Sequence, residues 1–184
     1  MPDLTIIIAS TRPGRAGLPI GTWFAERARV DGAFDVRVVD LADVGLPMYD
    51  EPDHPRLRRY RNQHTKDWSA TIDAADAVVF VTPEYNYGYP ASLKNAIDFL
   101  HEEWAYKPVG FVSYGGVAAG TRAIIFPLVH GNIWHIQDLR SSPIVTRRLS
   151  LGIDVGDKYG STKRHAVVVG VSSLDAVCHI VEWG

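Results

Sequence analysis

The sequence predicts an α/β protein with a doubly wound parallel sheet, in which helices cover both faces to make three layers. Three observations predict this fold class. Short apolar runs rich in β-branched residues recur at residues 4–9, 77–81 and 109–112. Segments in which apolar residues have helical spacing lie between these runs. Strands that alternate with helices pair in parallel through right-handed crossovers, which produces this architecture.

The first strand and the first helix are predicted close to the N-terminus. The apolar run from Leu4 to Ala9 suits a strand that is buried on both faces of a parallel sheet. Between Ile20 and Ala28, apolar residues recur at three- and four-residue steps. Pro19 occupies an early position that a helix tolerates. A strand followed directly by a helix is therefore expected.

The next part of the chain is predicted to hold an edge strand and an irregular excursion. Residues Phe34 to Val38 alternate apolar with polar side chains, as in a strand with one wet face. The segment from Pro47 to His64 contains three prolines and many charges, so it is predicted to be mostly irregular. A helix over about residues 63–73 is expected to follow and to lead into the strand at 77–81.

A further helix is predicted to begin near Pro90. Its apolar spacing indicates a buried face made by Leu93, Ala96, Ile97 and Leu100. The strand at 109–112 follows this helix.

Bulk composition restricts the class of function. A chain of 184 residues with 46% hydrophobic residues can bury one sizeable core, which predicts a single domain over residues 1–184. The formal net charge of -2 disfavours a nucleic-acid partner held by a basic field. Cys178 is the only cysteine, which argues against disulfides and multi-cysteine metal sites and fits a reducing cytoplasm. Neither a leader-like start nor a long apolar run indicates secretion or membrane insertion.

Three polar or glycine-rich loops follow the predicted strands, and the carboxyl ends of parallel strands share one sheet edge. The first, residues 10–17, carries Ser10, Thr11, Arg12 and Arg15. Hydroxyls, guanidinium groups and free amides are what a phosphate monoester requires. The loop matches neither GxGxxG nor GxxxxGK[ST], so a dinucleotide fold or an NTPase is not supported. Taken alone, an ordinary polar loop explains it equally well.

The other two loops contain aromatic rings and glycines. Residues 82–90 hold three tyrosines, two prolines and one glycine, which is unusual for packing alone. The third loop, Ser113-Tyr114-Gly115-Gly116, has paired glycines that permit a flat ligand to approach the backbone, although a simple turn would use them too. The convergence of three such loops at one edge predicts a ligand site.

The second loop and the helix after it carry the most specific signal. Pro83-Glu84-Tyr85-Asn86, followed by Leu93-Lys94-Asn95-Ala96-Ile97-Asp98, is similar to the PEYN loop and LKNxxD helix of the NADPH-dependent FMN reductase family. This family includes quinone, azo-dye and chromate reductases. The resemblance covers residues 4–124 and implies a flavodoxin-like fold with strand order 2-1-3-4-5, in which the position of the fifth strand is left open.

The resemblance also implies FMN as the cofactor and three groups of residues that hold it. The phosphate and ribityl chain are surrounded by Ser10, Thr11, Arg12, Arg15, Leu18, Pro19 and Ile20. The isoalloxazine ring is lined by Pro83, Glu84, Tyr85, Asn86 and Tyr87. Its other edge lies near Ser113, Tyr114, Gly115 and Gly116.

The implied activity is that of an NAD(P)H oxidoreductase. Bound flavin would accept hydride from NADPH or NADH and pass electrons to a quinone, a similar small acceptor or free flavin by ping-pong kinetics, without a catalytic side chain. The resemblance further implies a homodimer or tetramer with the flavin near the interface. The alternative is a flavin-binding electron-transfer or redox-sensing module without its own NAD(P)H turnover.

Several other polar residues are interpreted without a catalytic role. The seven histidines are scattered without metal-site spacing, so no metal is expected. Lys94 and Asp98 are expected to pair within their helix or across a dimer. Glu102 and Glu103 are interpreted as a solvated helix end, and Cys178 as a small apolar core residue.

The resemblance weakens beyond Ile124, where family members continue with a helix, a fifth strand and a closing helix. Pro127 interrupts the expected helix, and residues 130–148 lack a helical period. The later strand candidate is 166–171, followed by a short helix-like segment at 174–181. Two hypotheses follow. One is divergence with a long excursion before the fifth strand, and the other is a reading-frame shift near Ile125 that replaced the family's tail.

Overall fold

The structure is a computed structural model that describes residues 1–105, 107–116, 118–124, 164–172 and 175–183, the last two ranges as backbone. Four parallel strands form its centre, in the order β2 (Asp35–Asp40), β1 (Asp3–Ile8), β3 (Ala77–Pro83) and β4 (Val109–Tyr114). This order confirms the predicted doubly wound sheet with strand order 2-1-3-4. In the register, Ile8 at the end of β1 lies between Asp40 of β2 and Val81 of β3.

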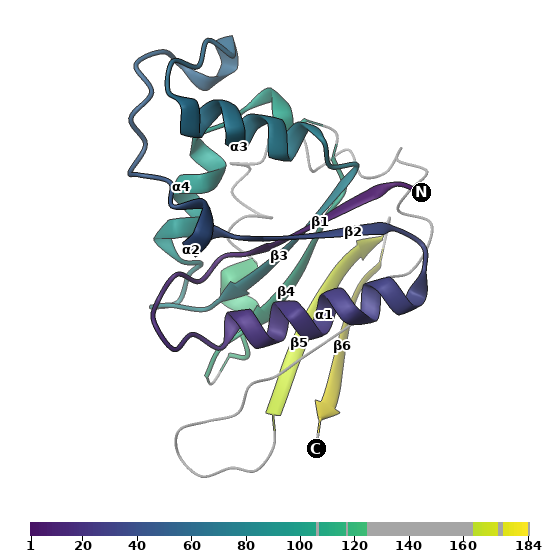
Figure 1. Cartoon of the computed structure of the whole chain (residues 1–184). Helices are drawn as coiled ribbons and strands as arrows, with labels where there is room; N and C mark the ends of the chain where they lie inside the picture. The colour runs from purple at the N-terminus through teal and green to yellow at the C-terminus, as the bar shows by residue number, and fades with distance from the viewer. Residues whose placement is uncertain (106, 117, 125–163, 173–174, 184) are drawn as a thin grey trace.

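Helices cover both faces of this sheet, as Figure 1 shows. Helix α1 (Gly17–Asp31) lies on one face, while α3 (Gln63–Asp73) and α4 (Ala91–Asp98) lie on the other with the short α2 (Leu41–Val44) beside them. The 3-10 turns η1 (Pro55–Leu57) and η2 (Glu102–Trp104) complete the described N-terminal part. No helix in the described part of the chain is long and apolar enough to cross a membrane.

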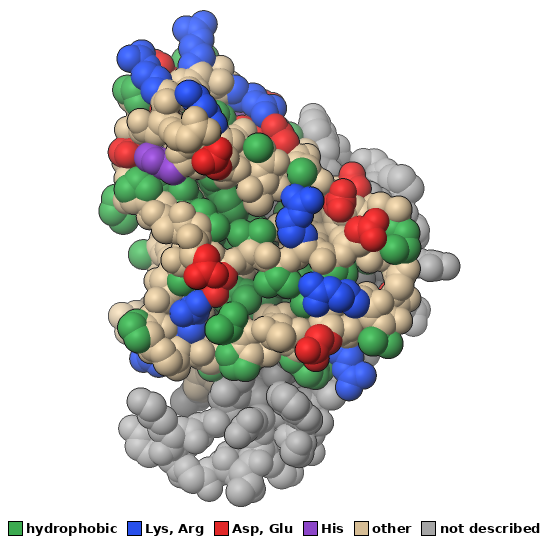
Figure 2. Space-filling view, in the orientation of Figure 1, with side chains coloured by type: hydrophobic (Ala, Val, Ile, Leu, Met, Phe, Trp, Pro, Cys, Tyr) green, Lys and Arg blue, Asp and Glu red, His purple; other side chains and the backbone are tan. Residues whose placement is uncertain are grey.

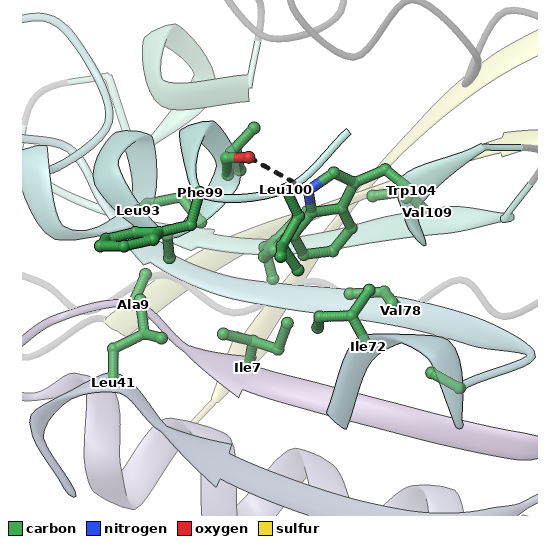
Figure 3. Packing of buried hydrophobic residues seen from close by; sticks show 14 of the residues in the cluster. Ile7, Ala9, Leu41, Ile72, Val78, Leu93, Phe99, Leu100, Trp104 and Val109 are labelled. Atoms are coloured by element: carbon green, nitrogen blue, oxygen red, sulfur yellow. Dashed lines mark hydrogen bonds between the residues drawn. The ribbon is translucent and has the colours of Figure 1, made fainter. Parts of the chain in front are cut away.

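Alternate residues of the buried strands divide the core into two layers. On the α1 face, Ile6, Ile8 and Val81 pack with Phe24 of the helix. On the opposite face, drawn in Figure 3, the strand residues include Ile7 and Val78. This alternation follows from the two-residue period of a strand. Because both strand faces are buried, the strands appear in the sequence as continuous apolar runs rather than as alternating patterns.

Aromatic rings and their hydrogen bonds join α3, α4 and η2 in the second layer. The Trp68 and Trp104 rings meet edge to face at 6.2 Å between centroids. Their indole N–H groups donate to main-chain carbonyls of α4, Trp68 to Ala96 at 2.8 Å and Trp104 to Ile97 at 3.1 Å. Buried indoles thus keep hydrogen-bond partners, as burial of a polar group requires.

Side-chain hydrogen bonds order the excursion between α2 and α3, which the sequence predicts as irregular. Asn95 of α4 donates to the Pro47 carbonyl at 2.7 Å and accepts from the Tyr49 amide at 2.9 Å. The buried Glu51 carboxylate accepts from the amides of Arg61 and Asn62, each at 2.9 Å. The segment is therefore irregular but anchored at both ends.

The interpretation of Glu103 as part of a solvated helix end is wrong. This residue is only 1% exposed, and its carboxylate accepts hydrogen bonds from Ser69 at 2.6 Å and Tyr60 at 2.8 Å. Adjacent residues of a turn point in different directions, so Glu103 faces α3 while Glu102 stays at the surface. In the neighbouring helix, Lys94 and Asp98 form the predicted pair one turn apart.

Two strands extend the sheet beyond β4, in the order β5 (Arg164–Ser172) and β6 (Asp175–Trp183). β5 covers the strand candidate at 166–171 but runs antiparallel to β4, unlike the parallel fifth strand of the expected order. The helix predicted at 174–181 is wrong over residues 175–181, which pair with β5 as an antiparallel strand. With two residues between β5 and β6, a hairpin is the only pairing that the connection permits. The side chain of Cys178 and the segment 130–148 lie outside what the structure describes.

Candidate functional site

Loop 1 (residues 9–16) joins β1 to the amino end of α1. It turns through a hydrogen bond from the Arg15 amide to the Arg12 carbonyl at 3.2 Å, with Gly14 at φ +67°. The first hydrogen bond of the helix runs from the Ile20 amide to the Ala16 carbonyl. Pro19 has no N–H, but the amides of Gly17 and Leu18 have no partner within the helix, so they favour an anion at this point.

Three buried polar atoms without a hydrogen-bond partner gather beside this helix start. Among the described residues, four buried side-chain polar atoms lack a partner, and three of these are Ser10 Oγ, Arg15 Nε and the Tyr114 hydroxyl. The fourth is Thr65 Oγ1 in α3. Because buried polar groups are normally satisfied, a group of this kind indicates a place where a polar ligand would complete the hydrogen bonding.

Gly17 brings two of these atoms to the start of α1. A Cβ at this position would lie 2.2 Å from Ser10 Oγ and 2.5 Å from the Tyr114 hydroxyl. The two hydroxyls therefore flank the backbone of Gly17, and only glycine leaves room for them. Loops from β1 and β4 thus meet at the end of one helix.

The Tyr114 hydroxyl stays neutral at physiological pH. Burial raises the pKa of Tyr114 to about 12, although Ser10 and the positive charges of Arg15 and Arg12 act in the opposite direction. A neutral phenol can donate one hydrogen bond to an anionic oxygen. The positive charges of Arg12 and Arg15 in loop 1 thus act on this hydroxyl.

Arg15 reaches across to the end of β2, where it forms an ion pair with Asp40. The two side chains are 16% and 7% exposed, so the pair is largely shielded from water. The other carboxylate oxygen of Asp40 accepts from the Ala42 amide at 2.9 Å and caps α2. Arg15 is thus held in place by β2 rather than extended freely into solvent.

Loop 2 (residues 84–90) follows β3 and forms a tight turn of its own. Tyr85 and Gly88 exchange main-chain hydrogen bonds at 2.8 and 3.0 Å. Asn86 and Tyr87 between them have φ of +47° and +67°, a conformation that costs free energy for residues other than glycine. Tyr87 is 74% exposed, so the turn presents an aromatic ring at the surface.

Loop 3 (residues 115–116 and 118–120) follows β4, and residues on either side of it are tied to loop 2. The Glu84 amide donates to the Tyr114 carbonyl at 2.8 Å. The Glu84 carboxylate, which is 9% exposed, forms an ion pair with Arg122 at 3.0 Å. The Arg122 guanidinium also lies 4.1 Å from the centre of the Tyr87 ring. One arginine therefore contacts loop 2 at two points, Glu84 before the turn and the Tyr87 ring within it.

A cavity of about 340 Å³ lies beside loop 1, between α2 and the start of α4. It is lined by Thr11, Leu41, Ala42, Gly45, Leu46, Met48, Ala91, Ser92 and Asn95. Ser92 donates to the Ala9 carbonyl at 2.5 Å, and Asn95 bonds the excursion as described above. Its wall thus combines apolar side chains with polar groups that the protein itself partly engages.

The structure brings most of the predicted site residues to one edge of the sheet and places others differently. The Ser10 and Tyr114 hydroxyls flank Gly17 at the start of α1, Arg15 in the adjoining loop pairs with Asp40, and Ser113 is fully buried. Ile20 belongs to the core under α1, where it packs with Phe24, so its side chain does not line the loop. The exposed members are Thr11, Arg12, Leu18, Pro19, Tyr85, Asn86, Tyr87 and Gly116. Their roles stay predictions.

Sequence reasoning missed two residues that hold the site together. The predicted edge strand stopped at Val38, two residues before Asp40, and neither Asp40 nor Arg122 was assigned a role. A charged residue at the carboxyl end of a strand beside a basic loop is a signal that could have identified Asp40. Arg122 has no such signal, because its partner Glu84 is 38 residues away in the chain.

Comparisons with known proteins agree with this geometry. A family model described as NADPH-dependent FMN reductase matches residues 2–142. An NAD(P)H-dependent FMN reductase of Schizosaccharomyces pombe is 46% identical over 121 residues, which cover 65% of this chain and 60% of the relative. One of Saccharomyces cerevisiae is 45% identical over 93 residues, covering 47% of this chain and 49% of the relative. The chain thus spans about half to three fifths of the length of these relatives.

Solved structures show the same fold at lower sequence identity. The flavoenzyme FerB, an NAD(P)H:(acceptor) oxidoreductase from Paracoccus denitrificans, superposes with a TM-score of 0.56 at 22% identity. The alignment covers 74% of this chain and 72% of FerB. This likeness supports a flavodoxin-like fold for this chain.

Proposed function

This chain belongs to the NADPH-dependent FMN reductase family, and on that premise we propose that it binds FMN across loops 1, 2 and 3 and transfers electrons from NAD(P)H to a small acceptor. The acceptor class is a quinone or a similar compound, or free flavin. Relatives named quinone reductase and azoreductase support this class.

The observation that carries the proposal is the set of unpartnered polar atoms at the start of α1. Ser10 Oγ, Arg15 Nε and the Tyr114 hydroxyl are buried and lack hydrogen bonds. A phosphate monoester has several acceptor oxygens and a negative charge, so it fits two hydroxyl donors, an arginine and helix amides. The residues present therefore fit the phosphate end of FMN.

Loops 2 and 3 supply a surface for the ring end of the cofactor. Bound FMN supplies the redox chemistry by accepting hydride from NAD(P)H and releasing two electrons, which with two protons convert a quinone to a hydroquinone. The Glu84–Arg122 ion pair holds the loop 2 turn, and exposed Tyr85 and Tyr87 offer aromatic surface. Gly116 has open space where a side chain would stand, which leaves room for a flat ring. The protein's part is to bind and orient.

The proposal extends to the assembly and its surroundings. A homodimer or tetramer would bring a second subunit close to loop 2, and the exposed Tyr87 and Met48, at 74% and 78%, are apolar surface available for such a contact. A cytoplasmic location is supported by the single cysteine. On the face shown in Figure 2, acidic and basic side chains are interspersed over much of the surface, consistent with the net charge of -2.

Reconstitution with FMN tests the proposal. Purified protein incubated with FMN and freed of excess should keep a flavin visible spectrum, and NADPH or NADH added without oxygen should bleach it. A quinone should then restore the oxidised spectrum, and initial rates at several quinone concentrations should give parallel double-reciprocal lines. Protein that takes up no flavin would overturn the proposal. Flavin that stays oxidised with both nicotinamides but is reduced by a protein partner would favour an electron-transfer module instead.

A further inference from the structure

We propose that Asp40 is a positioning residue that fixes Arg15 at the phosphate end of the flavin site and so makes the site select FMN over riboflavin. The inference rests on the proposed function, because it assumes that a flavin binds at loop 1. It assigns a role to a residue of β2, a strand that none of the three loops follows.

Asp40 is itself held rigidly. One carboxylate oxygen accepts from the Ala42 amide at 2.9 Å as the cap of α2, and the other pairs with Arg15. Its side chain is 7% exposed. The carboxylate therefore has one well-defined position, and each oxygen has its own partner.

The register of the sheet places this carboxylate next to loop 1. Asp40 lies opposite Ile8 of β1, two residues before Ser10. Arg15 spans from loop 1 to that position, and its charge acts on the Tyr114 hydroxyl across the site. The guanidinium thus lies at the end of β2, beside the loop that carries Ser10.

The Arg15 side chain retains donor capacity for a ligand. Its Nε is buried and has no partner, although one terminal nitrogen is engaged by Asp40. An arginine has five N–H donors, so pairing with one carboxylate does not exhaust it. A long side chain that is already ordered loses less conformational entropy when a ligand binds. Asp40 therefore orders the Arg15 side chain before an anion binds.

Riboflavin distinguishes this role from a purely structural one. It has the ring and ribityl chain of FMN but no phosphate, so the ordering of Arg15 by Asp40 does not strengthen its binding. If Asp40 acts only by capping α2, its loss should affect both flavins alike. If it acts through Arg15, only FMN should be affected.

The experiment measures the Kd of FMN and of riboflavin by quenching of flavin fluorescence, on the full chain. Asp40→Asn keeps an N-cap acceptor, because asparagine caps as well as aspartate, but it removes the charge that pairs with Arg15. The expected result is an FMN Kd raised about tenfold and a riboflavin Kd changed less than about twofold. Combining it with Arg15→Gln should add little to the loss caused by Arg15→Gln alone, because both changes remove one interaction.

The matched control is Asp43→Asn, which removes an equal charge from the exposed side of the same short helix. It should leave the ratio of the two Kd values unchanged. If Asp40→Asn unfolds, Asp40→Glu keeps the charge and moves the carboxylate by one methylene, and it should weaken FMN binding alone.

Two results would overturn the inference while leaving the proposed function standing. Tighter FMN binding by Asp40→Asn would mean that Asp40 competes with the phosphate, and equal weakening of both flavins would mean that it acts through the fold. Wild-type protein that binds neither flavin would overturn the proposed function and this inference with it.

Discussion

Loops 1 and 2 leave the same edge of the sheet, yet they satisfy their polar groups in opposite ways. In loop 1 and its surroundings, Ser10, Arg15 and Tyr114 each keep a buried polar atom without a partner. In loop 2, Tyr85 and Gly88 close the turn on themselves, and the Glu84 carboxylate is matched by Arg122. The protein itself satisfies the polar groups of loop 2, whereas buried polar atoms in and around loop 1 stay without a partner.

This difference separates binding from support. An unpartnered buried polar group costs about 1–3 kcal/mol of stability, which a ligand can return when it supplies the hydrogen bond. A satisfied turn gains nothing further from a ligand's polar atoms but holds a fixed surface for a ring. We expect changes in loop 1 to act on ligand affinity, and changes in loops 2 and 3 to act first on stability.

The strongest way to break the comparison is to disrupt the contact between β4 and loop 3. In Gly120→Ala, the new Cβ would lie 2.5 Å from the Tyr114 nitrogen at a φ of +84°. The expected loss is about 3 kcal/mol of unfolding free energy, measured by urea denaturation. Gly32→Ala is the control, because its φ is +72° but the space around it is open, and it should cost about 1 kcal/mol. Equal losses would show that the contact with Tyr114 is unimportant.

The next effect is expected from Glu84→Gln, which weakens the ion pair between loop 2 and Arg122, two residues after loop 3. Glutamine is neutral, so Arg122 would lose the charge of its largely buried partner. The FMN-free protein should therefore lose about 1–2 kcal/mol of unfolding free energy. Asp53→Asn removes one partner of the exposed Arg61 pair at 3.2 Å and should cost less than about 0.5 kcal/mol. If Glu84→Gln leaves stability unchanged and weakens only FMN binding, loop 2 acts on ligand affinity as loop 1 does.

Removing the unpartnered hydroxyls should sharpen the comparison. Tyr114→Phe and Ser10→Ala delete buried polar atoms that have no partner, so the FMN-free protein should be unchanged or up to about 1 kcal/mol more stable. FMN affinity should fall about tenfold, or roughly 1.4 kcal/mol. The control is Tyr60→Phe, whose lost hydroxyl donates to Glu103 at 2.8 Å. It should lower stability by about 1 kcal/mol and leave FMN binding unchanged. A destabilised Tyr114→Phe would contradict the idea of an incomplete loop.

The smallest effect concerns the scaffold away from both loops. Burial acts to raise the pKa of Glu103, but hydrogen bonds from Ser69, Tyr60 and the His101 amide outweigh it and hold this pKa below its ordinary value of 4.5. The folded-state pKa is thus lower than that of the unfolded chain. The stabilisation is complete above pH 4.5 and is lost as the pH falls through the folded-state value.

Denaturation curves across this acidic range test the scaffold. Ser69→Ala should flatten the pH dependence by removing the bond at 2.6 Å. A dependence that does not change in this variant would place the acid sensitivity elsewhere.

The sequence predicted the elements up to β4 more accurately than the strands after it. Helix α3 was predicted at its observed bounds, and β1, β3 and β4 within one or two residues, because continuous apolar runs belong to strands buried on both faces. The segment 175–183 was predicted in part as a helix and is a strand. Short apolar segments do not distinguish the two states, and pairing with β5 decides between them.

The sequence by itself determined the fold class, the family and the three loops that meet at the sheet edge, because periodicity and the Pro83–Asp98 motif are local properties of the chain. Only the tertiary structure decided which polar groups find partners. Arg15 pairs with Asp40, Glu84 with Arg122 and Glu103 with Ser69, each more than twenty residues apart. Such pairing depends on strand register and helix packing, which bring distant residues together and leave Ser10 and Tyr114 without a partner at the start of α1.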